Sequence, residues 1–222
     1  MRLALTALLL LTVLPATAAS LRDVRVDVVD GMYVLRSEAW FDAGVVELYE
    51  VLLDWDRSTE FSSVVVESRN VEPGEDGRPG FYSRIRGCVL LFCRSFERNG
   101  TVTHKPYEYI VATADPNRSD FHVSEEHWRF QTEDDGTVVV YDLVVKPKFW
   151  IPPVIGPYAL KRKLRSSGGD ALDRIEAAAQ ALRVERALQS GVDGPTGSSQ
   201  ANSLGNSQGN TQGNTQGSPD TE

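Results

Sequence analysis

The sequence predicts an α+β domain in which an antiparallel β-meander is followed by one long C-terminal helix. Between residues 64 and 146, apolar residues alternate with a period of two in short segments that turn residues separate. This pattern is typical of successive strands joined by short turns. Between residues 157 and 188, apolar residues instead recur every three or four positions, which indicates an amphipathic helix. In total we expect about seven strands, with two short helices after the first strand.

The first predicted strand covers Met32–Phe41, with Leu35, Ala39 and Phe41 on one face. Asp42 follows and is suited to cap a helix, because its carboxylate accepts hydrogen bonds from free backbone amides. That helix has apolar residues at Val45, Leu48 and Leu52, and a second helical turn is expected over Arg57–Ser62.

Six more strands follow, and short segments rich in Gly, Pro, Asp and Asn separate most of them. Glu133–Gly136 suits a hairpin turn, and Pro73–Gly80 is a longer loop. The six predicted strands are Val64–Glu72, Phe81–Cys88, Cys93–His104, Tyr107–Ala114, Asp120–Thr132 and Thr137–Lys146.

The last predicted element is a helix over Pro157–Leu188 whose apolar stripe faces the sheet. Gly168 and Gly169 lie in the middle of this helix, where each costs about 1 kcal/mol relative to alanine. Two explanations remain open. The glycines permit a close approach or a kink, or they keep a hollow open beneath the helix.

The two ends of the chain differ in composition from the domain at residues 20–189. Residues 1–19 have Arg2, an apolar run of about 12 residues and small residues at Ala16–Ala18, which is typical of a cleaved secretory signal. Residues 190–222 are mostly Gly, Ser, Asn, Gln and Thr, and we expect them to be disordered. The protein is therefore expected to be exported, to a Gram-negative periplasm rather than the extracellular space.

Composition and charge exclude several classes of function. The 222 residues carry a formal net charge of −8, which argues against nucleic acid as a partner. Two cysteines and three histidines exclude zinc-finger and iron–sulfur frameworks. No motif implies a cofactor or a metal site, and we expect a monomer.

Several short segments resemble the START/polyketide cyclase superfamily, also called helix-grip or SRPBCC proteins, in a bacterial exported branch. They are Leu52–Asp56 with Phe61 and Ser62, Asp120–Phe121 before Trp128, Gly136–Thr137, and Lys146–Pro153 before the helix. The resemblance covers about residues 24–184. It implies a curved sheet wrapped around the long helix, which encloses an apolar cavity for a lipid, sterol, quinone or polyketide.

A cavity in such a fold would be lined by inward-facing residues of the strands and by the middle of the helix. A strand register that is wrong by one residue would exchange half of the assignments. The residues expected to line the cavity are Trp40, Ile85, Trp128, Phe130, Tyr141, Leu143, Gly168 and Leu172.

Cys88 and Cys93 are predicted to form a disulfide. In one continuous strand, five residues span about 16 Å, which is too far for a bridge. If the chain reverses between the cysteines, they become opposed residues of a hairpin at bonding distance. An exported chain with two cysteines favours their oxidation.

Two apolar segments with basic neighbours are predicted to form a membrane-docking rim at the cavity mouth. One is the hairpin tip Val89, Leu90, Leu91 and Phe92, flanked by Arg84, Arg86 and Arg94. The other is Phe149, Trp150 and Ile151, preceded by Lys146 and Lys148. An even number of strands separates the two segments, so a meander places both at the same end of the sheet. The alternative is that these residues pack inward.

These observations predict a carrier that binds a hydrophobic ligand in an internal cavity and exchanges it at an anionic membrane surface. One alternative is a polyketide cyclase- or dehydratase-like enzyme that uses the same cavity, with His122 as a weak catalytic candidate on the predicted face of Trp128. A second alternative is a protein-interaction module. We expect a carrier rather than an enzyme.

Overall fold

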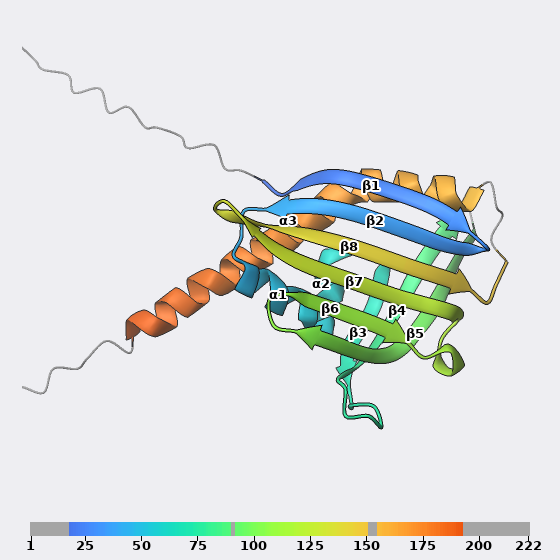
Figure 1. Ribbon diagram of the computed structural model, residues 1–222, viewed down its shortest axis with the longest axis horizontal. Helices are drawn as coiled ribbons and strands as arrows, with labels where there is room; N and C mark the ends of the chain where they lie inside the picture. Colours follow the sequence, from blue (N-terminus) through green and yellow to red (C-terminus); the bar gives the residue numbers. More distant parts are fainter. Residues whose placement is uncertain (1–17, 90–91, 151–154, 193–222) are drawn as a thin grey trace, which may run out of the picture.

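The computed structural model describes residues 18–89, 92–150 and 155–192, and contains one antiparallel sheet and a long helix (Figure 1). The strands lie in the order β1-β2-β8-β7-β6-β5-β4-β3. Their bounds are β1 Ser20–Val29, β2 Met32–Phe41, β3 Val65–Val71, β4 Gly80–Val89, β5 Phe92–Lys105, β6 Tyr109–Ala114, β7 Phe121–Glu133 and β8 Gly136–Pro147. The helical elements are α1 Val45–Leu53, η1 Trp55–Arg57, α2 Ser58–Phe61, η2 Pro116–Arg118 and α3 Ile155–Val192.

The predicted α+β helix-grip architecture is confirmed, and the described residues form eight strands where the sequence predicted about seven. The additional strand is β1, which pairs only with β2 at the edge of the sheet. Its register shifts between Leu21 and Asp23, and most of its residues are exposed. The alternation of Val24, Val26 and Val28 with Arg25 and Asp27 was a signal for this strand that the sequence analysis did not use.

The chain leaves the sheet after β2 and returns at the opposite edge. β2 pairs with β8, whereas β3 pairs with β4, and α1, η1 and α2 connect the two edges. The predicted cap of α1 was wrong, because the helix begins after Gly44 and has no side-chain cap. The Asp42 backbone amide instead donates a hydrogen bond to Glu176 Oε2 at 2.7 Å.

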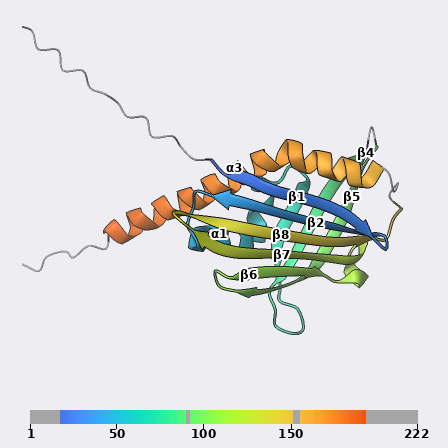
Figure 2. The same ribbon diagram turned by 45° about the horizontal axis from the view of Figure 1, so that its top comes forward.

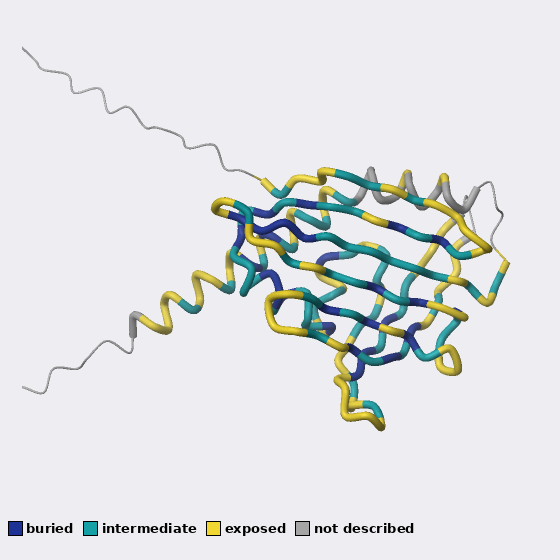
Figure 3. Tube along the Cα trace, in the orientation of Figure 1, coloured by how far each residue is buried: buried dark blue, intermediate teal, exposed yellow. Residues whose placement is uncertain are grey.

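The apolar core lies toward one end of the sheet. Buried side chains of α1 and α2 pack there against β2 and β8, around Leu48, Phe41 and Val139. A second buried cluster joins Trp55 to the β4–β6 region, around Phe81 and Ile110. Figure 3 shows buried residues in α1 and along the strands, whereas the β3–β4 loop is mostly exposed.

Helix α3 runs along the sheet and then continues beyond it. It contacts β1, β2, α1 and α2, and its C-terminal part projects away from the rest of the domain (Figures 1 and 2). Among the described residues, no helix has both the length and the apolar character needed to cross a membrane. Residues 1–17 of the predicted signal and residues 193–222 of the predicted tail lie outside the described residues.

Candidate functional site

The pairing of the strands defines the end of the sheet that carries the predicted docking segments. The β1–β2, β4–β5 and β6–β7 connections and the end of β8 all lie at this end, which we call the rim. The Glu72–Gly80 connection between β3 and β4 lies at the opposite end. Many of the core residues described above, such as Phe41, Phe81 and Val139, lie toward that opposite end.

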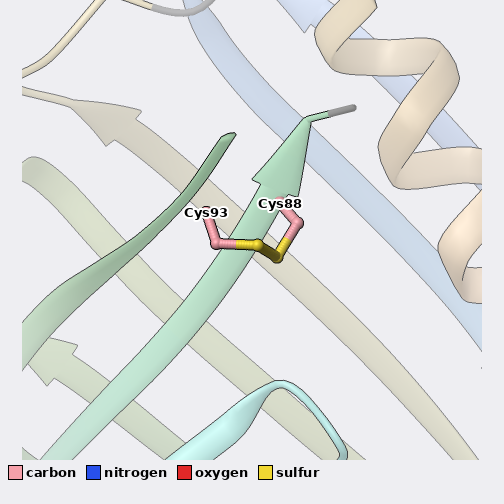
Figure 4. The surroundings of a disulfide bond; sticks show 2 residues. All are labelled: Cys88 and Cys93. Carbon is pink, nitrogen blue, oxygen red and sulfur yellow. A yellow bond between two sulfur atoms is a disulfide. The ribbon is translucent and has the colours of Figure 1, made fainter. Parts of the chain in front are cut away.

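The predicted disulfide is present at the rim. Cys88 and Cys93 are directly opposed partners of β4 and β5, with Cα atoms 4.0 Å apart (Figure 4). The strand ladder continues one pair further, to Val89 and Phe92. The hairpin connection is therefore shorter than the four-residue tip that the sequence predicted. Leu90 and Leu91 lie outside the described residues, as do the side chains of Val89 and Phe92.

The segment after β8 contacts residues beside the β4–β5 hairpin at the rim. Phe149, which follows β8, stacks on Phe96 of β5 with ring centroids 4.0 Å apart. Phe121 of β7 packs edge-on against both rings, and the Arg94 guanidinium lies 5.7 Å from the centroids of Phe96 and Phe149. The prediction that both segments share one end is confirmed. Phe149, however, packs inward, as the alternative held. The next residue, Trp150, is exposed, with 79% of its surface accessible.

The basic residues predicted around the rim divide into two groups. Arg86, Arg94, Lys146 and Lys148 are exposed, and the Lys148 Nζ donates to the Pro116 carbonyl. Arg84 is different, because it is only partly exposed and pairs with Glu67 at 2.7 Å on the convex face. Ile151 lies outside the described residues.

Further exposed apolar residues lie at the rim that the sequence analysis did not single out. Val28 and Val29 end β1 and are 44% and 51% exposed, and Tyr158 in the first turn of α3 is 67% exposed. The missed strand β1 explains the omission of the two valines. Together with Trp150, these residues form what we call the apolar rim patch.

Most of the predicted cavity residues on the strands face the concave side of the sheet. Ile85 shares its face with the buried Phe81, and Trp128, Phe130, Tyr141 and Leu143 lie on the face that α1 and α3 cover. All five are only partly buried. The prediction that Trp40 lines the cavity was wrong. β2 buries Ala39 and Phe41 on the concave side, so the alternation of the strand turns Trp40 to the convex side. The Trp40 ring packs beside Gly136, because a Cβ added to that glycine would lie only 2.6 Å from the ring.

The two predicted helix residues have different surroundings. Leu172 packs against the core around Leu48. A Cβ added to Gly168 would lie 3.8 Å from Leu21, and one added to Gly169 would meet nothing within 4 Å. A close approach of α3 to the sheet therefore does not require either glycine.

The sequence analysis missed a buried ion pair on the concave face. Arg98 of β5 and Glu126 of β7 form a hydrogen-bonded ion pair, and their side chains are 6% and 9% exposed. Beside the pair, the inward residues of the intervening strand β6 are Ala112 and Ala114. Because these are small, the long Arg98 side chain reaches Glu126 across β6. The pair lies between the core and the rim.

Polar groups without partners surround this pair. The buried Arg98 Nε and Nη2 and the hydroxyls of Ser83 and Ser124 have no hydrogen-bond partner among the described residues. Ser83 is the cross-strand partner of Arg98. Ser124 lies two residues before Glu126 on β7, so both side chains are on the same buried face. Burial, and then Glu126, raise the pKa of Tyr141 well above its ordinary value, so the phenol stays protonated and bonds to Glu126. We call these five residues the buried polar cluster.

Buried groups of this kind have hydrogen bonds in almost all proteins. An arginine with two unused N–H directions can donate to an oxygen of a bound molecule, and the serine hydroxyls can donate or accept. The cluster therefore offers polar recognition within a largely apolar concave face.

The histidines do not support catalysis at the predicted position. His122 is exposed, at a register shift between Phe121 and Val123, so it does not share the face of Trp128. His104 is partly buried, and its Nδ1 lies 2.5 Å from the Tyr49 hydroxyl in a hydrogen bond. It lines a pocket of about 340 Å³ at the end away from the rim, together with Glu50, Asp54 and Trp55. Within the described part of the chain, no group of acidic, histidine or cysteine side chains could hold a metal ion.

The family of the chain follows from a comparison with protein-family models. The model "Polyketide cyclase / dehydrase and lipid transport" matches residues 42–165, from the start of the α1 region into α3. The chain belongs to this family. The comparison with curated proteins gives no match.

Several solved structures have a similar fold. A STAR-related lipid transfer protein from Xanthomonas axonopodis is 16% identical with a TM-score of 0.54, over 72% of this chain and 99% of that one. Human STARD10 is 16% identical with a TM-score of 0.51, over 79% of this chain and 77% of that one. The di-domain ARO/CYC StfQ of the steffimycin pathway is 18% identical with a TM-score of 0.50, over 71% and 52% respectively. The fold and family indicate that this chain binds a hydrophobic small molecule.

Proposed function

We propose that this protein is an exported carrier that binds one hydrophobic ligand on the concave face of the sheet and exchanges it at a membrane. The observation that carries the proposal is the buried Arg98–Glu126 pair, whose guanidinium retains two N–H groups without partners. Apolar side chains such as Ile85 and Leu143 share the same concave face. A ligand with an apolar body and one polar group complements this arrangement.

The charge of the buried polar cluster limits the polar group of the ligand. Arg98 and Glu126 neutralise each other, and Tyr141 is held in its neutral form. An additional charge at this depth would have no partner and would be strongly disfavoured. A neutral oxygen function, such as a hydroxyl or a carbonyl of a sterol, quinone or neutral lipid, fits the available donors.

Exchange at a membrane rests on the apolar rim patch and its basic neighbours. Trp150 and Tyr158 have the amphipathic rings that favour the interface between water and acyl chains. Each exposed basic residue near an anionic surface contributes about 1 kcal/mol, and Arg86, Arg94, Lys146 and Lys148 lie at the same end. The rim is therefore the end from which a ligand would enter or leave.

Ligand binding is tested by native mass spectrometry of protein purified from its own host, followed by organic extraction. We expect a co-purifying neutral lipid-like molecule in the wild type and its loss in Arg98→Met. Arg183→Met, at an exposed position of α3, is the matched control and should retain the ligand. Equal ligand occupancy in Arg98→Met and Arg183→Met would contradict the role of the pair.

Membrane exchange is tested by flotation with vesicles of neutral or anionic lipid. Trp150→Ala is expected to reduce binding to anionic vesicles several-fold, whereas Leu188→Ala should not. Leu188 is 67% exposed at the projecting end of α3, so it controls for loss of exposed apolar surface. Binding that is independent of anionic lipid, or equally reduced by both substitutions, would count against exchange at an anionic membrane.

A second candidate function is a cyclase-like enzyme, which the Tyr49–His104 hydrogen bond beside the pocket at the opposite end favours. A histidine paired with a phenol is a suitable proton-transfer group. Turnover of a polyketide-type substrate that His104→Gln abolishes, with Arg98→Met still active, would support the enzyme over the carrier.

A further inference from the structure

The buried carboxylate of Glu176 in α3 lies at the point where the domain begins. Glu176 is 7% exposed. Its Oε2 accepts a hydrogen bond from the Asp42 amide at 2.7 Å, and its Oε1 accepts one from the Ala19 backbone nitrogen at 3.2 Å. Glu176 thus holds the start of β1 against the end of β2.

The surroundings of Glu176 lack a positive partner. Burial first, and then the acidic Asp42 and Asp173, raise the pKa of the Glu176 carboxyl. No lysine or arginine among the described residues forms an ion pair with Glu176. Two backbone amides stabilise the ionised form only in part.

The nitrogen that contacts Glu176 has a particular place in the sequence. The composition places the end of the predicted signal at about residue 19. Within it, Ala16-Thr17-Ala18 provides small residues at the cleavage positions, and a cut directly after Ala18 would make Ala19 the first residue of the mature chain. Ala18 is exposed, whereas Ala19 packs against the core. The bond between them therefore lies where the chain passes from solvent into the domain.

We propose that Glu176 is the acceptor for the α-amino group that cleavage between Ala18 and Ala19 creates. An export peptidase would hydrolyse this bond with one water molecule, which leaves a carboxyl group on Ala18 and an amine on Ala19. At neutral pH the amine takes a proton from solvent. Its N–H groups then donate to Glu176 from the same place as the Ala19 backbone nitrogen, 3.2 Å from Oε1. A neutral hydrogen bond becomes an ion pair, and the mature protein is more stable than its precursor.

The first experiment compares two forms of the domain. One is released from a fusion so that it begins with the free amine of Ala19, and the other retains Ala16–Ala18. At pH 7 we expect the free-amine form to unfold about 2–4 °C higher, the shift typical of one ion pair in a domain of this size. The difference should vanish in Glu176→Gln and persist in Glu185→Gln, a matched exposed position on α3.

A second measurement needs no variant that might fold poorly. The α-amino pKa of the form with free Ala19, followed by NMR, is expected about one unit above its ordinary value of about 7.7–8.0. Sequencing of the exported protein should give Ala19 as the first residue. An ordinary α-amino pKa, equal unfolding temperatures of the two forms, or another first residue would each overturn the proposal.

Discussion

At the residue scale, Arg98 and Glu126 distinguish the concave face of this protein from a purely apolar one. The two charged side chains are buried together as an ion pair. Charged residues in a core gain little net stability as a pair, but removal of one partner leaves the other charge uncompensated. Stability alone therefore does not explain the pair, whereas the proposed recognition of a ligand does.

This leads to a prediction for a double-mutant cycle. Arg98→Met alone should lower the free energy of unfolding by about 3–5 kcal/mol, because Glu126 would remain buried without a partner. Arg98→Met combined with Glu126→Met should recover most of that loss while ligand binding stays absent. Urea denaturation measures both. Equal destabilisation in the single and double variants would mean that packing, not charge, explains the effect.

A second residue-scale prediction concerns pH. Where Ala19 lies within a peptide bond, burial raises the pKa of Glu176 in the folded state above its unfolded value. Its contribution to stability is then complete below about pH 4 and is lost as the pH rises through the folded pKa. In the form that retains Ala16–Ala18, the free energy of unfolding of the wild type relative to Glu176→Gln should therefore fall between pH 4 and 7. Denaturant titrations at several pH values measure this difference. Parallel pH profiles would show that the pKa is not raised.

The sequence did not reveal the buried polar cluster, for a physical reason. Charged residues on strands usually face solvent, so Arg98 and Glu126 were not assigned to the interior. A signal was nevertheless present. Strict alternation along β5 places Arg98 on the same face as Val102, which is 1% exposed.

At the element scale, the strands that bury one face were predictable within a few residues. β8 and β5 have clear alternation, and turn residues end each of them. β1 was missed although Val24, Val26 and Val28 alternate with charged residues, which is a usable strand signal. The prediction that Asp42 caps α1 was wrong. The Asp42 backbone amide bonds to Glu176, which is far away in the sequence, and no local pattern encodes such a contact.

Two glycines provide a matched test of backbone conformation. Added Cβ atoms at Gly31 and Gly169 would each meet nothing within 4 Å, but Gly31 has a φ of +73° and Gly169 is helical. Gly169→Ala should raise the free energy of unfolding by about 1 kcal/mol, and Gly31→Ala should lower it by about 1–2 kcal/mol. Urea denaturation measures both. A loss of stability in Gly169→Ala would show that α3 needs this glycine.

At the scale of the whole molecule, the hydrogen bonds between α3 and the rest of the domain end at Arg186 among the described residues. Arg186 pairs with Glu47 at 3.5 Å and also with Glu50 of α1. Beyond it, Leu188 is largely exposed. The fold thus needs α3 only as far as its contacts with α1.

Deletion of residues 190–222 is therefore expected to leave the thermal midpoint within about 2 °C of the full chain. Differential scanning calorimetry measures the midpoint. A chain that ends before Arg186 serves as the comparison, and we expect it to be less stable. A large decrease on the shorter deletion would reveal contacts from the low-complexity segment to the domain.

The pairing of β2 with β8 also affects how the chain folds. Strands β3 to β8 join through short connections between neighbours, so this meander can form from local encounters. The β1–β2 hairpin, by contrast, must find β8 across roughly a hundred residues of chain, and such long-range closure slows folding. Because β8 is synthesised after β2, the first hairpin to leave the ribosome is among the last to be incorporated, and its exposed edge needs protection until then.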